Sequence, residues 1–102
     1  MDDFKLVSEC LKGNSKAQKA LFERFAPKMY AVCLRYMKRE EAAKDVLQDG
    51  MIKVFLKLGD FKNEGVLEGW IRRVMVNTCL DQLRKDLKFQ TDVQLGDVEY
   101  KL

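Results

Sequence analysis

The sequence predicts an all-α domain, a compact bundle of about four helices. Four segments repeat apolar residues at intervals of three and four, which is the spacing of a helix face. A single proline and six glycines among 102 residues are too few for a turn-rich β fold, and this length suits one domain. We assign the helical domain to residues 1–88. We interpret residues 89–102 as a tail or the start of a linker, because FQTDVQLGDVEYKL alternates only weakly and contains a glycine.

The first two helices are expected over residues 2–12 and 15–37. Gly13 can end the first helix, since glycine readily adopts the left-handed conformation of a helix end. Ser15 and Gln18 have the spacing of a capping box, in which the two side chains bond the free amides of a helix start. We therefore expect Ser15 to cap the second helix.

Proline and glycine punctuate the middle of the chain. Pro27 predicts a bend near residues 23–26 of one continuous helix, because the apolar pattern stays in phase across it. A third helix is expected over about residues 40–58, although Gly50 within it costs roughly 1 kcal/mol relative to alanine. Gly59 follows as a natural helix stop.

Residues 70–88, which form most of the last helix, have the most distinctive surface. The helix itself is expected to begin near Val66 or Leu67, after the loop GDFKNEG at residues 59–65. Apolar side chains occupy two sectors of this helix, so we expect it to be mostly buried. Its polar side chains share one narrow sector, a cationic ribbon that consists of Trp70, Arg73, Asn77, Asp81, Arg84 and Lys88.

Composition favours binding over catalysis. Residues 86–102 hold two lysines and four acids and thus contribute −2 to the chain's net charge of +3. Residues 1–85 therefore carry a net charge of +5, which suits an anionic partner. The chain has no histidine and no phosphate-binding glycine loop, so we expect no enzyme activity and no cofactor. No apolar run approaches the ~20 residues that span a bilayer, so we expect a cytoplasmic protein without a membrane partner.

Neither the cysteines nor the acids form a metal-binding pattern. Cys10, Cys33 and Cys79 lie far apart at helical positions, so we expect reduced thiols that pack in the core. Asp45 and Asp49 lie one turn apart, but no second acidic helix completes a cage around a cation. We therefore expect no metal.

The third helix resembles a known family. Residues 43–55, AKDVLQDGMIKVF, are similar to the A-E-D-L-V-Q-E-x-F-x-R-V-W stretch of extracytoplasmic-function sigma factors, the small members of the bacterial sigma-70 family. Three further segments are similar in order and spacing to F-R-G, W-x-x-R-x-x-x-N and L-D-x-L-R-R of that family. They are Phe61-Lys62-Asn63, Trp70 with Arg73 and Asn77, and residues 80–85 (LDQLRK). The resemblance covers about residues 15–85 and implies the sigma factor region 2 fold, the first, minus-ten-binding domain.

The resemblance implies a polymerase-binding face and possible regulation. In the family, the third helix docks on the arginine-rich clamp helices of the RNA polymerase beta-prime subunit. That role carries over by position to Asp45, Gln48, Asp49 and Ile52. A plain solvated helix face is the alternative. An anti-sigma factor is a further partner to consider.

The resemblance also implies a promoter-binding face. The family's loop and last helix bind the unpaired non-template strand of the minus-ten element and take a flipped base into a pocket. By position the pocket residues are Lys53, Phe61, Lys62, Asn63 and Asn77, with Arg73, Arg84 and Lys88 near phosphates. Trp70 is a candidate wedge against the duplex edge, with core packing the equal alternative. Phe61 could likewise be a loop anchor in the core.

Several departures keep alternatives open. Lys44, Gly50, Met51 and the segment GVLEG at residues 65–69 differ from the family pattern, which leaves the base preference open. No residues remain for the family's minus-thirty-five-binding domain, so we expect an excised first domain or a single-domain relative. The competing interpretation is a helical protein-interaction or adaptor domain that does not bind DNA.

Overall fold

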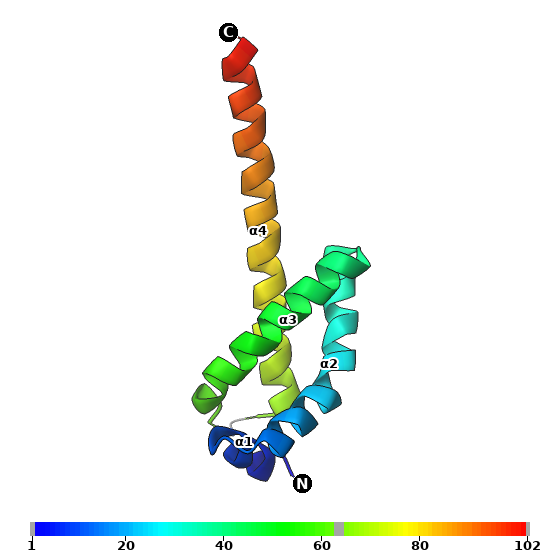
Figure 1. The fold of residues 1–102 in the computed structure, drawn as a ribbon, viewed down its shortest axis with the longest axis vertical. Coiled ribbons are helices and arrows are strands. Elements are labelled where there is room, and N and C mark those ends of the chain that lie inside the picture. The colour runs from blue at the N-terminus through cyan, green and yellow to red at the C-terminus, as the bar shows by residue number, and fades with distance from the viewer. Residues whose placement is uncertain (1, 63–64, 102) are drawn as a thin grey trace.

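The computed structural model describes residues 2–62 and 65–101, and it confirms the all-α prediction. Within these residues lie α1 (Asp3–Leu11), α2 (Ser15–Met37), α3 (Glu40–Lys57), the short 3₁₀ helix η1 (Leu58–Asp60) and α4 (Leu67–Lys101). Figure 1 shows α3 crossing the first part of α4, with α2 beside them and α1 near the end where α4 begins. None of the described helices is long and apolar enough to cross a membrane.

The starts of α1 and α2 are capped by polar side chains. Asp2 accepts a hydrogen bond from the Lys5 amide at 2.8 Å, and Gly13 has the expected left-handed φ of 85°. The predicted capping box at Ser15 is wrong. Asn14 caps α2 instead and accepts from the amides of the second and third residues after it at 3.0 and 3.2 Å. Asparagine caps a helix as well as serine does, so α2 takes its cap one residue earlier.

The middle of the chain bends at Pro27 and turns at Lys38. α2 remains one helix through Pro27, and Figure 1 shows it changing direction near its middle, as predicted. Lys38 ends α2 with a left-handed φ of 66°, and its amide donates to the Leu34 carbonyl oxygen at 2.8 Å. Gly59, the predicted stop of α3, has no positive φ, because η1 continues the turn with tighter 3₁₀ geometry.

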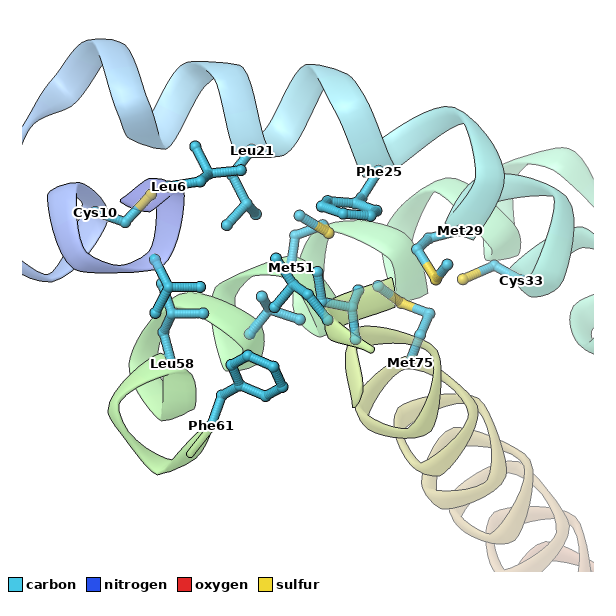
Figure 2. Packing of buried hydrophobic residues seen from close by; sticks show 14 of the residues in the cluster. Leu6, Cys10, Leu21, Phe25, Met29, Cys33, Met51, Leu58, Phe61 and Met75 are labelled. Carbon is cyan, nitrogen blue, oxygen red and sulfur yellow. The ribbon is translucent and has the colours of Figure 1, made fainter. Parts of the chain in front are cut away.

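The core takes side chains from all four α-helices. Figure 2 shows Leu6, Leu21, Phe25, Met51 and Met75 converging from different helices. The three cysteines are buried and free. Burial, with Cys79 nearby, raises the pKa of Cys33 to about 12. This thiol therefore stays protonated at neutral pH, as a small hydrophobic side chain would.

Gly50 lies where α3 crosses α4. It is buried, and a Cβ added there would overlap the Met75 sulfur. Met75 is itself fully buried, so its side chain has little room to move away. The crossing therefore explains a glycine inside a helix: α3 accepts weaker helix propensity in exchange for close contact with α4.

The second half of α4 departs from the prediction. The segment after Lys88, expected to be irregular, continues α4 as far as Lys101. Figure 1 shows this part of α4 extending beyond the other helices. The helix predicted to be mostly buried is also more exposed than expected toward residue 88, since Leu83 is 37% and Leu87 65% exposed. Burial requires a neighbouring element, and the bundle does not reach these positions.

Candidate nucleic-acid interface

A hollow of about 230 Å³ lies between α3 and α4. We call it the central hollow. Both helices and the turn after α3 contribute to it, so the fold brings together side chains that are up to 28 positions apart in sequence. Its lining residues are Lys53, Lys57, Asp60, Trp70, Arg73, Val74, Asn77, Thr78 and Asp81.

The lining of the central hollow combines cations with hydrogen-bonding groups. Lys53 is half-buried, while Arg73 and Asn77 are exposed, so these side chains remain open to a ligand. The buried Thr78 hydroxyl donates to the Val74 carbonyl oxygen at 2.8 Å and is thereby occupied as a donor. An unpaired nucleic-acid strand needs cations for its phosphates and amides for its base edges, and this hollow offers both.

Trp70 and Phe61 form an aromatic pair at one end of the central hollow. Their ring centroids lie 5.8 Å apart at an angle of 51°. Phe61 is only 7% exposed, whereas Trp70 is half-buried and lines the hollow. Phe61 thus packs behind Trp70 as part of the core, and Trp70 presents the aromatic surface that a base could contact.

Two neighbouring hollows extend the central one. A hollow of about 210 Å³ at the start of α4 shares Trp70 and Arg73 with it. A hollow of about 310 Å³ further along α3 and α4 shares Lys53, Thr78 and Asp81 with it and adds Lys85. We call these the loop hollow and the distal hollow. The three hollows follow one another along α4 and share lining residues, and we call them together the α4 groove.

A further hollow of about 490 Å³ lies between the first part of α3 and α4, and it shares Asp49 and Gln82 with the distal hollow. We call it the acidic hollow. Its charged lining consists of four carboxylates and one guanidinium, so the hollow favours a cationic partner. The lining residues are Met37, Arg39, Glu41, Ala42, Asp45, Val46, Gln48, Asp49, Gln82 and Asp86.

The residues predicted to bind polymerase are all exposed on α3. Asp45, Gln48 and Asp49 line the acidic hollow. Ile52 is 54% exposed and lines the distal hollow together with Asp49, so the four residues form one exposed stripe of α3. A partner that covers this stripe would contact all four.

The predicted DNA-binding residues divide into three groups. Lys53, Trp70, Arg73 and Asn77 meet in the central hollow, and Phe61 supports Trp70 from behind. Lys62 is exposed outside the central hollow, and Asn63 lies outside the described residues. Arg84 and Lys88 are exposed further along α4, where Arg84 donates to Asp81 at 2.8 Å.

The structure adds residues to the site that the sequence prediction omitted. Lys57 also lines the central hollow. It lies one turn after Lys53 on α3, so its spacing could have predicted that it belongs to the same site. Asp60 reaches the hollow through η1, a turn with no clear sequence signal. Asp81 belongs to the predicted polar ribbon and also lines the hollow.

An ion pair fastens the start of α4 to α2. Lys28 donates to Glu68 at 2.8 Å, and this hydrogen bond, reinforced by the lysine charge, lowers the pKa of Glu68. Glu68 also lies in the first turn of α4, where a negative charge favours the helix. The pair helps to fix the first turns of α4, which carry Trp70 and Arg73.

Comparisons with known proteins show which family this chain resembles. The family model described as sigma-70 region 2 matches residues 21–88. The ECF RNA polymerase sigma factor SigM of Mycobacterium tuberculosis is 30% identical over 81% of this chain and 42% of the relative. The RNA polymerase sigma-H factor of Pseudomonas aeruginosa is 27% identical over 96% of this chain and 52% of the relative.

A third relative matches a similar share of this chain. The ECF RNA polymerase sigma-E factor of Haemophilus influenzae is 30% identical over 81% of this chain and 43% of the relative. The chain thus spans about half the length of these relatives. The matched residues include most of α2, all of α3 and the part of α4 that lines the groove. The chain therefore belongs to the sigma-70 region 2 family.

Proposed function

We propose that this domain acts in bacterial transcription initiation in the cytoplasm, and that it works by binding alone. The acidic side of α3 docks on the clamp helices of the RNA polymerase beta-prime subunit. The α4 groove holds the unpaired non-template strand of the minus-ten promoter element. Family membership supports the general role, and the arrangement of side chains supports the two binding faces.

One observation carries the DNA-binding part of this proposal. Lys53 on α3 and Trp70, Arg73 and Asn77 on α4 line a single hollow. A lysine, an arginine, an exposed amide and an aromatic ring are the groups that single-strand recognition uses. Packing of α3 against α4 does not by itself require these four side chains to surround one hollow.

Charge supports the polymerase-binding part. The whole chain has a net charge of +3, yet the acidic hollow has four carboxylates and one guanidinium, so negative charge is concentrated there. Acidic side chains attract and orient a basic helical partner, as the arginine-rich clamp helices would be. An anti-sigma factor is a further proposed partner, since any protein that covers α3 would block docking.

The decisive experiment measures both faces with the same protein. The immobilised chain is expected to retain bacterial core RNA polymerase. With polymerase present, the chain is expected to bind fluorescent single-stranded DNA from a promoter more tightly than the matching duplex. Absence of DNA binding in the presence of retained polymerase would leave a protein-interaction domain as the function. Absence of both would remove the sigma-type role altogether.

Asn77→Ala tests the base-contacting role within the same assay. Loss of the amide should weaken single-strand binding about tenfold, the usual magnitude for a hydrogen bond at a desolvated site, and should leave polymerase retention unchanged. Gln90→Ala is the matched control, because Gln90 is an exposed amide on α4 that lines none of the three hollows. Equal effects of the two substitutions would argue against a base contact at Asn77.

A further inference from the structure

Asp81 occupies an unusual place in a groove proposed to hold DNA. Asp81 lines both the central and the distal hollow, which are otherwise lined by lysine and arginine side chains among others. One of its oxygens, Oδ1, accepts a hydrogen bond from the Arg84 guanidinium at 2.8 Å, and the Asp81 side chain is 53% exposed. The carboxylate is therefore oriented by a neighbour and still accessible to a ligand.

A carboxylate in a strand-binding groove must meet a hydrogen-bond donor. Phosphates and sugar oxygens within a DNA strand are acceptors, so they are repelled by a carboxylate or gain nothing from it. The donors of DNA are the N–H groups of the bases, above all the exocyclic amino groups. Thymine lacks such an amino group, and its single ring N–H lies between two carbonyl oxygens. A carboxylate therefore discriminates against thymine.

The neighbouring groups leave this role to Asp81. Thr78 donates to its own helix and has no hydroxyl proton left for a ligand. Lys53, Lys57 and Arg73 are cations suited to phosphates. Asp60, the other carboxylate of the central hollow, does not line the distal hollow, and Asp49, the other carboxylate of the distal hollow, does not line the central one. Asp81 is thus the carboxylate that lines both hollows.

Building on the proposed function, we propose that Asp81 selects an unpaired base that carries an exocyclic amino group over thymine. Adenine, cytosine and guanine share this chemistry. Arg84 acts as a positioning residue, because its hydrogen bond to Oδ1 holds the carboxylate in place. Arg84 therefore contributes to base choice through Asp81, a role distinct from phosphate attraction.

The test uses a labelled strand of twelve thymidines in which one central position holds a guest nucleotide. Deoxycytidine and deoxyuridine are the first pair of guests, and deoxyadenosine and deoxyinosine the second, since each pair exchanges an amino group for a carbonyl oxygen. Affinities are measured with the 102-residue chain in the presence of core RNA polymerase. The wild-type chain should bind the amino-bearing guest of each pair about tenfold more tightly.

Two variants separate base selection from general charge effects. Asp81→Asn should bind both guests of a pair within about twofold, because an amide can both donate and accept. Arg84→Met should reduce the discrimination as well, since it releases the carboxylate. Asp3→Asn is the matched control: it removes one negative charge from another aspartate–arginine pair, which joins α1 to Arg24 of α2 at 2.8 Å, and should preserve the tenfold preference.

The remaining outcomes contradict the inference. Equal binding of both guests by the wild-type chain would overturn it while leaving the proposed function intact. A uniform rise in affinity for every guest in Asp81→Asn would show that the carboxylate only repels the strand, which also overturns it. Failure of the wild-type chain to bind any single strand in the presence of polymerase would remove the proposed function and this inference together.

Discussion

The two ends of α3 differ in charge although they belong to one helix. The first part, which lines the acidic hollow, presents Glu41, Asp45 and Asp49. The last part, which lines the central hollow, presents Lys53 and Lys57. The change follows the helix axis, since the first turn is acidic and the last turn basic, which complements the helix dipole. A single element thus offers surfaces suited to two oppositely charged partners.

This difference teaches how a small domain can serve two partners. The two surfaces share a buried core, and the crossing of Gly50 and Met75 fixes the distance between α3 and α4. Electrostatic attraction acts over several ångströms, so separate charges can select separate partners while packing holds the surfaces together. Surface substitutions should therefore affect one partner, and core substitutions should affect both.

Reversing the charge of the acidic end of α3 should have the largest effect. The double substitution Asp45→Lys and Asp49→Lys is expected to weaken retention of core polymerase about a hundredfold, because it replaces attraction by repulsion toward a basic partner. The fold should persist, since both side chains are exposed. Retention of polymerase by immobilised protein is the measurement, and Glu23→Lys on the exposed face of α2 is the control for added positive charge. Undiminished retention would remove α3 as the docking element.

Filling the helix crossing should disturb both surfaces together. Gly50→Ala is expected to lower the free energy of unfolding by about 1–2 kcal/mol, because the overlap with Met75 outweighs the gain of roughly 1 kcal/mol in helix propensity. Chemical denaturation provides the measurement. Adding Met75→Ala should make the double variant more stable than the sum of the two single effects predicts, since it removes the overlap. Purely additive effects would mean that Gly50 is not constrained by Met75.

Much of this architecture follows from local patterns in the sequence. Apolar spacing located each helix of the bundle, because burying one face is the strongest demand on an amphipathic segment. The same reasoning placed Trp70, Arg73 and Asn77 in one sector, and they do line one hollow. Their partner Lys53 came from the family resemblance, since no pattern within α4 indicates which part of α3 lies opposite.

Other features were beyond local reasoning. The burial of Phe61 depends on the position of Trp70, a contact between a loop and a helix nine residues later. The continuation of α4 to Lys101 was missed because the sequence there lacks a clear apolar stripe to predict a packed helix. The inclusion of Asp60 in the hollow depends on η1, which redirects the chain after α3. For Phe61 and Asp60 the missing information was the position of another element, whereas for the end of α4 it was the absence of an apolar stripe.

Two arginines on the proposed DNA-binding side of α4 should differ in their effect. Arg73 lines the central and loop hollows without an ion pair among the described residues, whereas Arg84 is paired with Asp81. Arg73→Gln is therefore expected to weaken single-strand binding severalfold. It should also reduce the slope of log K against the logarithm of the salt concentration by about 0.7 in magnitude, where K is the binding constant for the strand. Arg84→Gln should change the salt dependence less. Titrations at several salt concentrations measure both, and equal slopes for the two variants would contradict a phosphate contact specific to Arg73.

The smallest expected effect lies at the corner that borders the acidic hollow. Lys38 holds a left-handed conformation that is unfavourable for any residue with a Cβ, and its neighbours Met37 and Arg39 line the hollow. Lys38→Gly should raise the free energy of unfolding by about 0.5 kcal/mol, because relief of this strain exceeds the added entropy of the unfolded chain. Thermal denaturation should show a rise in Tm of about 3 °C. Lys38→Ala removes the same charge but keeps the Cβ, so it should give no such rise. If both variants were stabilised equally, loss of the lysine charge beside α2 and α3 would be the cause, and backbone strain at the corner would be unimportant.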